Sequence, residues 1–128
     1  MSKTNVTVTS RKINASTSVL EIRGEVNAFA ENAVMDAYTQ ATASGSQTIL
    51  LDFSGMEYMN SAGIGLLATL LIRCNHQQQR LLACNLPEHY QLIFEITRLN
   101  EVIKIFPTEA EALKAFETTV SEFNAVNA

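Results

Sequence analysis

The sequence is poor in several kinds of residue, and each scarcity excludes a class of protein. Only five glycines and two prolines occur among 128 residues, whereas 47% of the residues are hydrophobic. This composition excludes a collagen-like, low-complexity or disordered chain. Nine lysines and arginines stand against thirteen aspartates and glutamates, with no basic run. The sequence therefore lacks the electrostatic footprint of a nucleic-acid or anionic-membrane surface.

Cysteine and long apolar runs are scarce as well. The two cysteines, Cys74 and Cys84, are too few and too poorly spaced for a zinc site or a disulfide framework, and we expect both to be buried in a reducing compartment. The N-terminus is polar and does not resemble a signal peptide. The most apolar segment, Ala62–Ile72, has about half the length of a membrane span. We therefore expect a cytoplasmic protein with neither nucleic acid nor membrane as a partner.

The hydrophobic periodicity predicts alternating strands and helices. The predicted strands are Val6–Ser10, Ser18–Arg23, Thr48–Phe53, Leu81–Cys84 and Val102–Phe106. The predicted helices are a stripe from Asn27 to Ala41, the segment Ser61–Cys74, a helix opened by Pro87, and a stripe from Ala110 to Phe123.

This order predicts an α/β fold with a mixed, mostly parallel sheet of five strands, four helices and an N-terminal β-hairpin. The length favours one domain over residues 1–128, with a core of about 5–118. We expect a monomer, frayed at Asn124–Ala128.

Function is expected between Ile49 and Leu67. A buried strand ends at Phe53, a loop is predicted over Ser54–Met59, and a helix begins at Asn60 or Ser61. Helix starts beyond the carboxyl ends of parallel strands present unpaired N–H groups, where sites gather. A helix cap worth about 1 kcal/mol is the structural alternative for both residues.

Enzymatic chemistry finds little support. The segment Gly63–Ala68 matches a dinucleotide fingerprint, but it lies too far from the preceding strand and no acid ends the next one. No lysine completes a P-loop. A serine nucleophile would need a base, and His76 and His89 lie on separate polar stretches. Asp52 and Glu57 are isolated, so we predict no catalytic residue, no metal and no cofactor.

Large apolar residues surround this helix start. Met56, Tyr58 and Met59 precede it, and Leu66 and Leu70 lie off the main apolar stripe of the helix. Two interpretations remain open. The loop folds back over the core, or these residues form an exposed patch that docks a partner protein.

The segment from Leu51 to Leu67, LDFSGMEYMNSAGIGLL, resembles the signature of the single-domain STAS proteins, the bacterial anti-sigma factor antagonists. The likeness extends over about Asn5–Thr118 and includes Gly24–Val26 and Ile96–Leu99. The order of predicted elements is also that of the family.

The resemblance implies a partner switch. The matching serine, Ser61, would be phosphorylated by a serine kinase that doubles as an anti-sigma factor, and a metal-dependent serine phosphatase would reverse the reaction. The unphosphorylated form would bind the kinase and the phosphorylated form would release it. The partner-binding residues implied by the resemblance are Asn27, Met56, Glu57, Tyr58, Met59, Asn60, Ser61, Ala62, Gly63 and Leu66.

Three residues depart from the family pattern. Asn60 and Asn27 replace aspartates, and Ala62 replaces a second serine or threonine. The two asparagines remove negative charge near the switch, which leaves open a STAS scaffold without phosphorylation. A third alternative is a small-ligand binder that uses the helix N-terminus as an anion site.

Overall fold

The structure, a computed structural model, describes residues 5–115 of the chain. The strands are β1 (Val6–Asn14), β2 (Thr17–Val26), β3 (Thr48–Met59), β4 (Arg80–Cys84) and β5 (Lys104–Phe106). The helices are α1 (Glu31–Ala43), α2 (Ser61–His76) and α3 (Glu88–Ile96), with short 3-10 turns η1 (Ala28–Ala30) and η2 (Leu99–Glu101). Residues 109–115 are helical too. The rest of the predicted last helix and the predicted frayed end lie outside the described residues.

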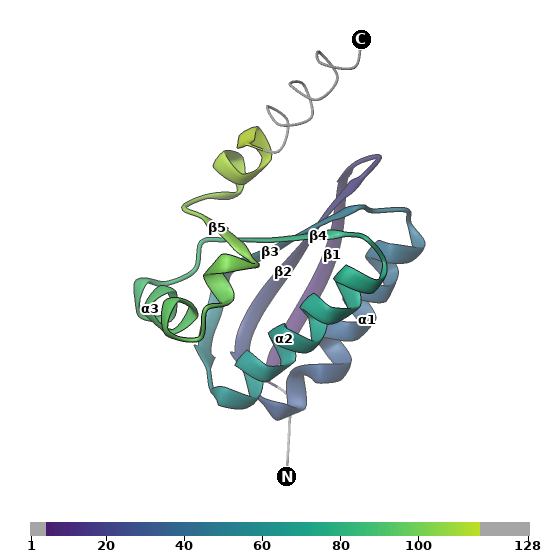
Figure 1. The fold of residues 1–128 in the computed structure, drawn as a ribbon. Helices are drawn as coiled ribbons and strands as arrows, with labels where there is room; N and C mark the ends of the chain where they lie inside the picture. Colours follow the sequence, from purple (N-terminus) through teal and green to yellow (C-terminus); the bar gives the residue numbers. More distant parts are fainter. Residues whose placement is uncertain (1–4, 116–128) are drawn as a thin grey trace.

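The five strands form one sheet in the order β1-β2-β3-β4-β5 (Figure 1). β1 and β2 form an antiparallel hairpin, and the pairs β2–β3, β3–β4 and β4–β5 are parallel. The predicted α/β architecture, with its mixed sheet and N-terminal hairpin, is confirmed. No helix within residues 5–115 has the length and apolar character needed to cross a membrane.

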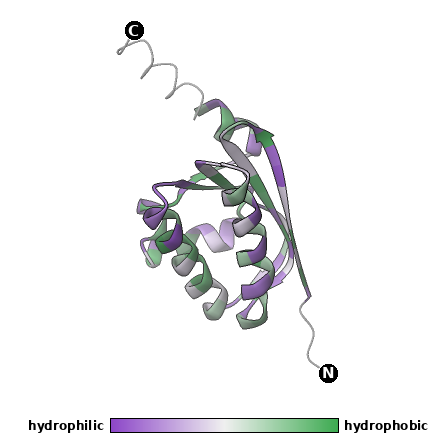
Figure 2. Cartoon of the chain, turned by 90° about the vertical axis from the view of Figure 1, so that its right-hand side faces the viewer, coloured by the Kyte–Doolittle hydropathy of each residue, from purple (hydrophilic) through white to green (hydrophobic). Residues whose placement is uncertain are grey.

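Helices cover the two faces of the sheet unequally. On one face, α1, α2 and α3 pack over the sheet (Figure 2). They enclose large side chains such as Phe53 and Phe94, whose ring centroids lie 6.5 Å apart in an edge-to-face arrangement. On the other face, residues 109–115 cover a smaller apolar cluster. Neighbouring residues of β3 alternate between these faces, because side chains alternate along a strand. Leu51 therefore belongs to the large core, whereas Leu50 belongs to the small cluster.

Ser54–Met59, predicted as a loop, is the second half of strand β3. This half of β3 continues along β2 beyond the last β4 partner, Cys84. Between the pairs Glu21–Asp52 and Arg23–Gly55, and again between Gly24–Met56 and Glu25–Tyr58, β3 carries one extra residue. In a regular strand every second side chain points inward. Because of these two bulges, the inward side chains of this half of β3 are three residues apart, at Phe53, Met56 and Met59.

Several element ends also differ from prediction. β2 continues through Gly24 to Val26, although its pairing with β1 ends at Gly24. Pro87 is the N-cap of α3 and not its first helical residue. The last strand starts at Lys104, because the preceding residues turn in η2 and Val102 is exposed.

Candidate partner-binding site

The site forms where β2 and β3 end side by side. Val26 and Met59 are the last paired residues of these strands. Each is followed by an asparagine that begins a helical segment, Asn27 before η1 and Asn60 before α2. Two helix starts therefore lie together at the carboxyl edge of the sheet, at the lower end of Figure 1.

Both asparagines are N-caps. The Oδ1 atom of Asn60 accepts a hydrogen bond from the N–H of Gly63 at 3.1 Å. The Oδ1 atom of Asn27 accepts one from the N–H of Phe29 at 2.9 Å. Such caps stabilise a helix start by about 1 kcal/mol. The two asparagines that depart from the family pattern thus preserve a cap and carry no charge.

Ser61 is the first residue of α2 and is exposed. The sequence left Asn60 and Ser61 as alternative N-caps of this helix, and the structure shows that Asn60 is the cap. The Ser61 hydroxyl is therefore not needed for capping. That hydroxyl makes no side-chain hydrogen bond within residues 5–115. It is therefore accessible at the positive end of a helix dipole.

Gly63 allows the start of α2 to approach β2 closely. A Cβ atom at this position would lie 2.3 Å from the carbonyl oxygen of Val26 and 2.8 Å from Cγ of Met59. Only glycine fits this gap without displacing the helix. The Asn60 N–H donates to the same Val26 oxygen at 3.2 Å, so backbone contacts fix the position of Ser61.

The predicted apolar residues are mostly buried. Met56, Met59, Leu66 and Leu70 all belong to the large core, so an exposed patch made by these side chains is wrong. The alternative correctly predicted their burial, although residues 54–59 are part of a strand and not a loop that folds back. Of the apolar residues singled out there, Tyr58 is the exception, with half of its surface exposed.

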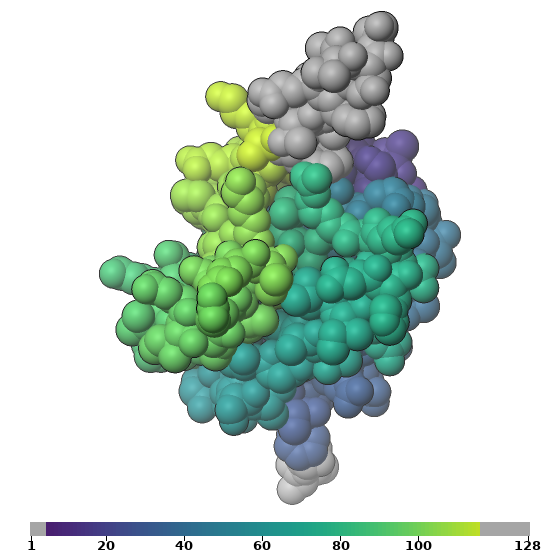
Figure 3. Space-filling model, in the orientation of Figure 1, coloured from purple at the N-terminus to yellow at the C-terminus, as the bar shows by residue number. Residues whose placement is uncertain are grey.

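A hollow lies between η1 and α2, and Ala62, the residue after Ser61, is part of its lining. Its volume is about 230 Å³, and its lining consists of Asn27, Ala28, Glu31, Ala62, Leu66 and Thr69. Asn27, Ala62 and Leu66 were predicted from the sequence as partner-binding residues, whereas Ala28, Glu31 and Thr69 were not. The helical spacing of Ala62, Leu66 and Thr69 places them on one face of α2, but only the fold brings η1 against that face. Figure 3 shows the surface of α2 in teal, between the blue surface of η1 and α1 and the green surface of α3.

Phe29 was also missed. Its side chain is 58% exposed on η1, two residues after the Asn27 cap. It is a large exposed ring close to the hollow, of the kind that interfaces use.

Within residues 5–115, the candidate base, thiol and metal-ligand groups do not assemble around Ser61. His76 ends the 16-residue helix that Ser61 begins, which separates them by about 22 Å at 1.5 Å per residue. Burial raises the pKa of both Cys74 and Cys84 to about 12, so neither supplies a thiolate at neutral pH. Within residues 5–115 no three His, Cys, Asp or Glu side chains are grouped as a metal site requires.

Comparison with known proteins identifies the family. The model of the STAS domain matches residues 9–112. This chain, with its mixed sheet and its serine at the start of α2, belongs to the STAS domain family.

Two similar proteins are anti-sigma factor antagonists. The anti-sigma-B factor antagonist of Listeria monocytogenes is 26% identical over 90 residues, which cover 70% of this chain and 79% of that protein. The antagonist SpoIIAA in its unphosphorylated form has a similar fold, with a TM-score of 0.67 and 18% identity over 86% of this chain and 97% of SpoIIAA. The structure of the Bacillus cell fate determinant SpoIIAA in its phosphorylated form is also similar, with a TM-score of 0.67. Its identity is 20%, over 85% of this chain and 98% of the SpoIIAA chain.

Proposed function

We propose that this protein is an anti-sigma factor antagonist, which binds an anti-sigma factor that is also a serine kinase and is released from it by phosphorylation of Ser61. A serine phosphatase would restore binding. The observation that carries the proposal is the exposed Ser61 hydroxyl at the start of α2, beside a neighbour that already provides the cap. The Listeria relative and the two SpoIIAA structures support the class of function.

Phosphorylation of Ser61 is expected to leave the folded monomer stable and to weaken its binding to the partner. A phosphate adds about −1.5 to −2 charges. At the N-terminus of α2 it gains about 0.3–1 kcal/mol from the helix dipole, so the folded monomer tolerates it. Buried against a partner without a counter-charge, the same group costs about 2–5 kcal/mol, or about thirty- to several-thousand-fold in affinity.

The members of the predicted partner-binding set play two parts in this proposal. Glu57, Tyr58, Ser61 and Ala62 are exposed and would contact the partner. The partly exposed Asn27 and Asn60 border that contact. Support from below would come from the buried members, which are Met56, Met59, Gly63 and Leu66.

Affinity capture from the native cell lysate tests the proposal. The baits are the wild type, Ser61→Ala, Ser61→Asp and Gln77→Glu, with mass spectrometry to identify captured proteins. Gln77→Glu is the charge control, because it adds one negative charge at the exposed opposite end of α2. We expect every bait except Ser61→Asp to retain a serine-kinase-like or anti-sigma protein. Equal capture by all four baits refutes control by phosphorylation.

A second candidate is a STAS interaction module that is not phosphorylated. The neutral caps Asn27 and Asn60 favour it, because a kinase that reads acidic residues beside its target serine would find amides here. Mass spectrometry of the protein purified from its native cells distinguishes the two. A phosphate on Ser61 supports the switch, whereas an unmodified Ser61 together with equal capture supports the module.

A further inference from the structure

The face of the sheet opposite α1, α2 and α3 holds a separate apolar cluster. Residues 109–115, named here the C-terminal cover, lie over it. Ala112 is fully buried against the sheet and Leu113 is partly buried. The sheet contributes an apolar strip, which consists of Val19, Leu50, Leu82 and Cys84.

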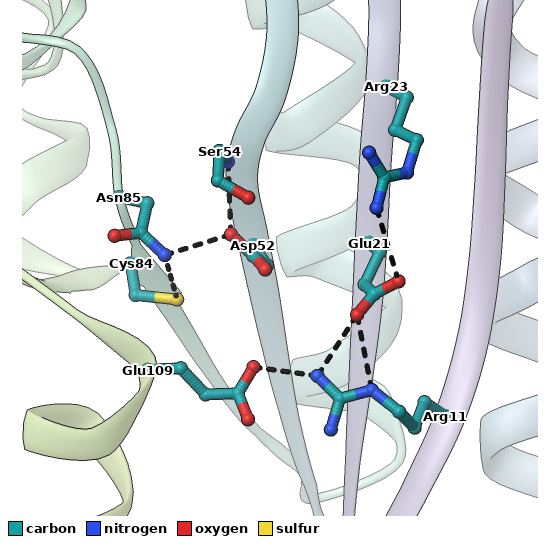
Figure 4. A network of polar contacts seen from close by, with 8 residues as sticks. All are labelled: Arg11, Glu21, Arg23, Asp52, Ser54, Cys84, Asn85 and Glu109. Atoms are coloured by element: carbon teal, nitrogen blue, oxygen red, sulfur yellow. Dashed lines mark hydrogen bonds and ion pairs between the residues drawn. The ribbon is translucent and has the colours of Figure 1, made fainter.

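An exposed ion pair ties the cover to β1. The Nη2 atom of Arg11 lies 2.7 Å from Oε1 of Glu109, and Arg11 also pairs with Glu21 on β2 at 3.1 Å (Figure 4). The Arg11 side chain is 42% exposed, so solvent weakens this tie. The cover thus packs on the strip through a methyl group and one half-buried leucine, with a solvated ion pair beside them.

The opposite face is held much more strongly. Three helices bury large side chains there, including Phe53, Leu67 and Phe94, and none of these is exposed. Segments with few buried apolar contacts open locally at lower free energy than the core. We propose that the C-terminal cover opens while the remaining domain stays folded, and that this opening exposes the apolar strip on the face away from Ser61.

The two cysteines report on the two faces separately. Cys84 belongs to the strip beneath the cover, and Cys74 lies on α2 in the large core. Both are fully buried, and a buried protonated thiol does not attack a thiol reagent. Labelling of Cys84 therefore requires the cover to open, whereas labelling of Cys74 requires the large core to open.

Alkylation of the full chain tests the proposal. Iodoacetamide is added under native conditions, samples are quenched over time, and each cysteine peptide is quantified by mass spectrometry. We expect Cys84 to be labelled at least tenfold faster than Cys74, with a rate that changes little in low urea because a local opening exposes little surface. Equal rates for both thiols overturn the proposal.

Two variants test the contacts that hold the cover on the sheet, which are the ion pair between Arg11 and Glu109 and the packing of Leu113. Glu109→Gln removes the pair with Arg11 but keeps the pair between Arg11 and Glu21, and we expect Cys84 labelling to rise about 1.5- to 5-fold, the range given by exposed ion pairs. Leu113→Ala acts through packing and is expected to raise it further. Cys74 labelling should stay constant, which also verifies folding.

The control is Glu101→Gln, which breaks another exposed ion pair, that with Arg98 at 2.7 Å, away from the cover. It should leave both rates unchanged. Unaltered Cys84 labelling in both Glu109→Gln and Leu113→Ala would refute the proposed cover.

Discussion

Two glycines of α2 permit a direct measurement of how closely this helix must approach β2. A Cβ atom at Gly63 would lie 2.3 Å from the carbonyl oxygen of Val26, which is backbone and cannot rotate away. A Cβ atom at Gly65, two residues later, would meet nothing within 4 Å. Gly63→Ala and Gly65→Ala are therefore the same chemical change on the same helix with opposite surroundings.

The expected effects differ in sign. Replacing a helical glycine with alanine stabilises a helix by about 0.5–1 kcal/mol. Gly65→Ala should gain this amount in full. At Gly63 the extra methyl group also overpacks the site, which costs about 1–3 kcal/mol. We expect Gly63→Ala to lower the free energy of unfolding by about 1 kcal/mol and at most about 2.5 kcal/mol, as the balance of these two effects.

Urea unfolding followed by far-ultraviolet circular dichroism measures both variants against the wild type. The midpoints should move in opposite directions while the slope of free energy against urea stays constant, since neither change alters the surface exposed on unfolding. If Gly63→Ala were stabilised as much as Gly65→Ala, the close approach of α2 to Val26 would be wrong, and with it the fixed position of Ser61.

Three further predictions concern caps, a buried hydrogen bond and pH. Asn60→Asp keeps the cap and should raise the melting temperature through about 0.3–1 kcal/mol of helix-dipole energy, whereas Asn60→Ala should cost about 0.5–2 kcal/mol. Tyr38→Phe removes the hydroxyl that donates to buried Gln79 at 2.7 Å and should cost about 1–3 kcal/mol in urea unfolding. The folded pKa of Cys74 and Cys84 is about 12 against a reference of 9.0, so the unfolded chain loses these protons first. The free energy of unfolding should then fall as pH rises from about 9 toward about 12, by up to about 1.4 kcal/mol per pH unit for each thiol. Urea unfolding at about pH 9 and about pH 10 measures this decrease, which should be smaller in a variant with alanine at both positions.

The predictable part of the fold is the part where hydrophobic period and secondary structure agree. The short strand predicted at Leu81–Cys84 appears as β4, and the helix predicted from Ser61 begins at that residue. The second half of β3 was missed because its inward residues recur every third position. That spacing results from two bulges against β2, and a bulge is a property of a strand pair that one strand's sequence does not reveal.

The candidate site divides in the same way. Local rules placed Ser61 at a helix start beyond a buried strand. They could not choose between Asn60 and Ser61 as the cap, because both residue types cap well. The burial of Met56 depends on the pairing of β2 with β3. The position of Glu31 in the hollow beside α2 depends on the contact between η1 and α2. Both contacts join residues that are distant in sequence, so local patterns do not predict them.

The two neutral caps bear directly on how a phosphate at Ser61 would act. Asn27 and Asn60 both make cap hydrogen bonds, so each fills the cap position without adding a charge to the site. With amides in place of carboxylates at both caps, a phosphate of about −1.5 to −2 charges would meet less repulsion within the monomer. An aspartate at position 61 carries only about half to two-thirds of that charge. Partner release by Ser61→Asp should therefore be weaker than release by the phosphorylated protein, and titration of one partner with both forms measures the difference.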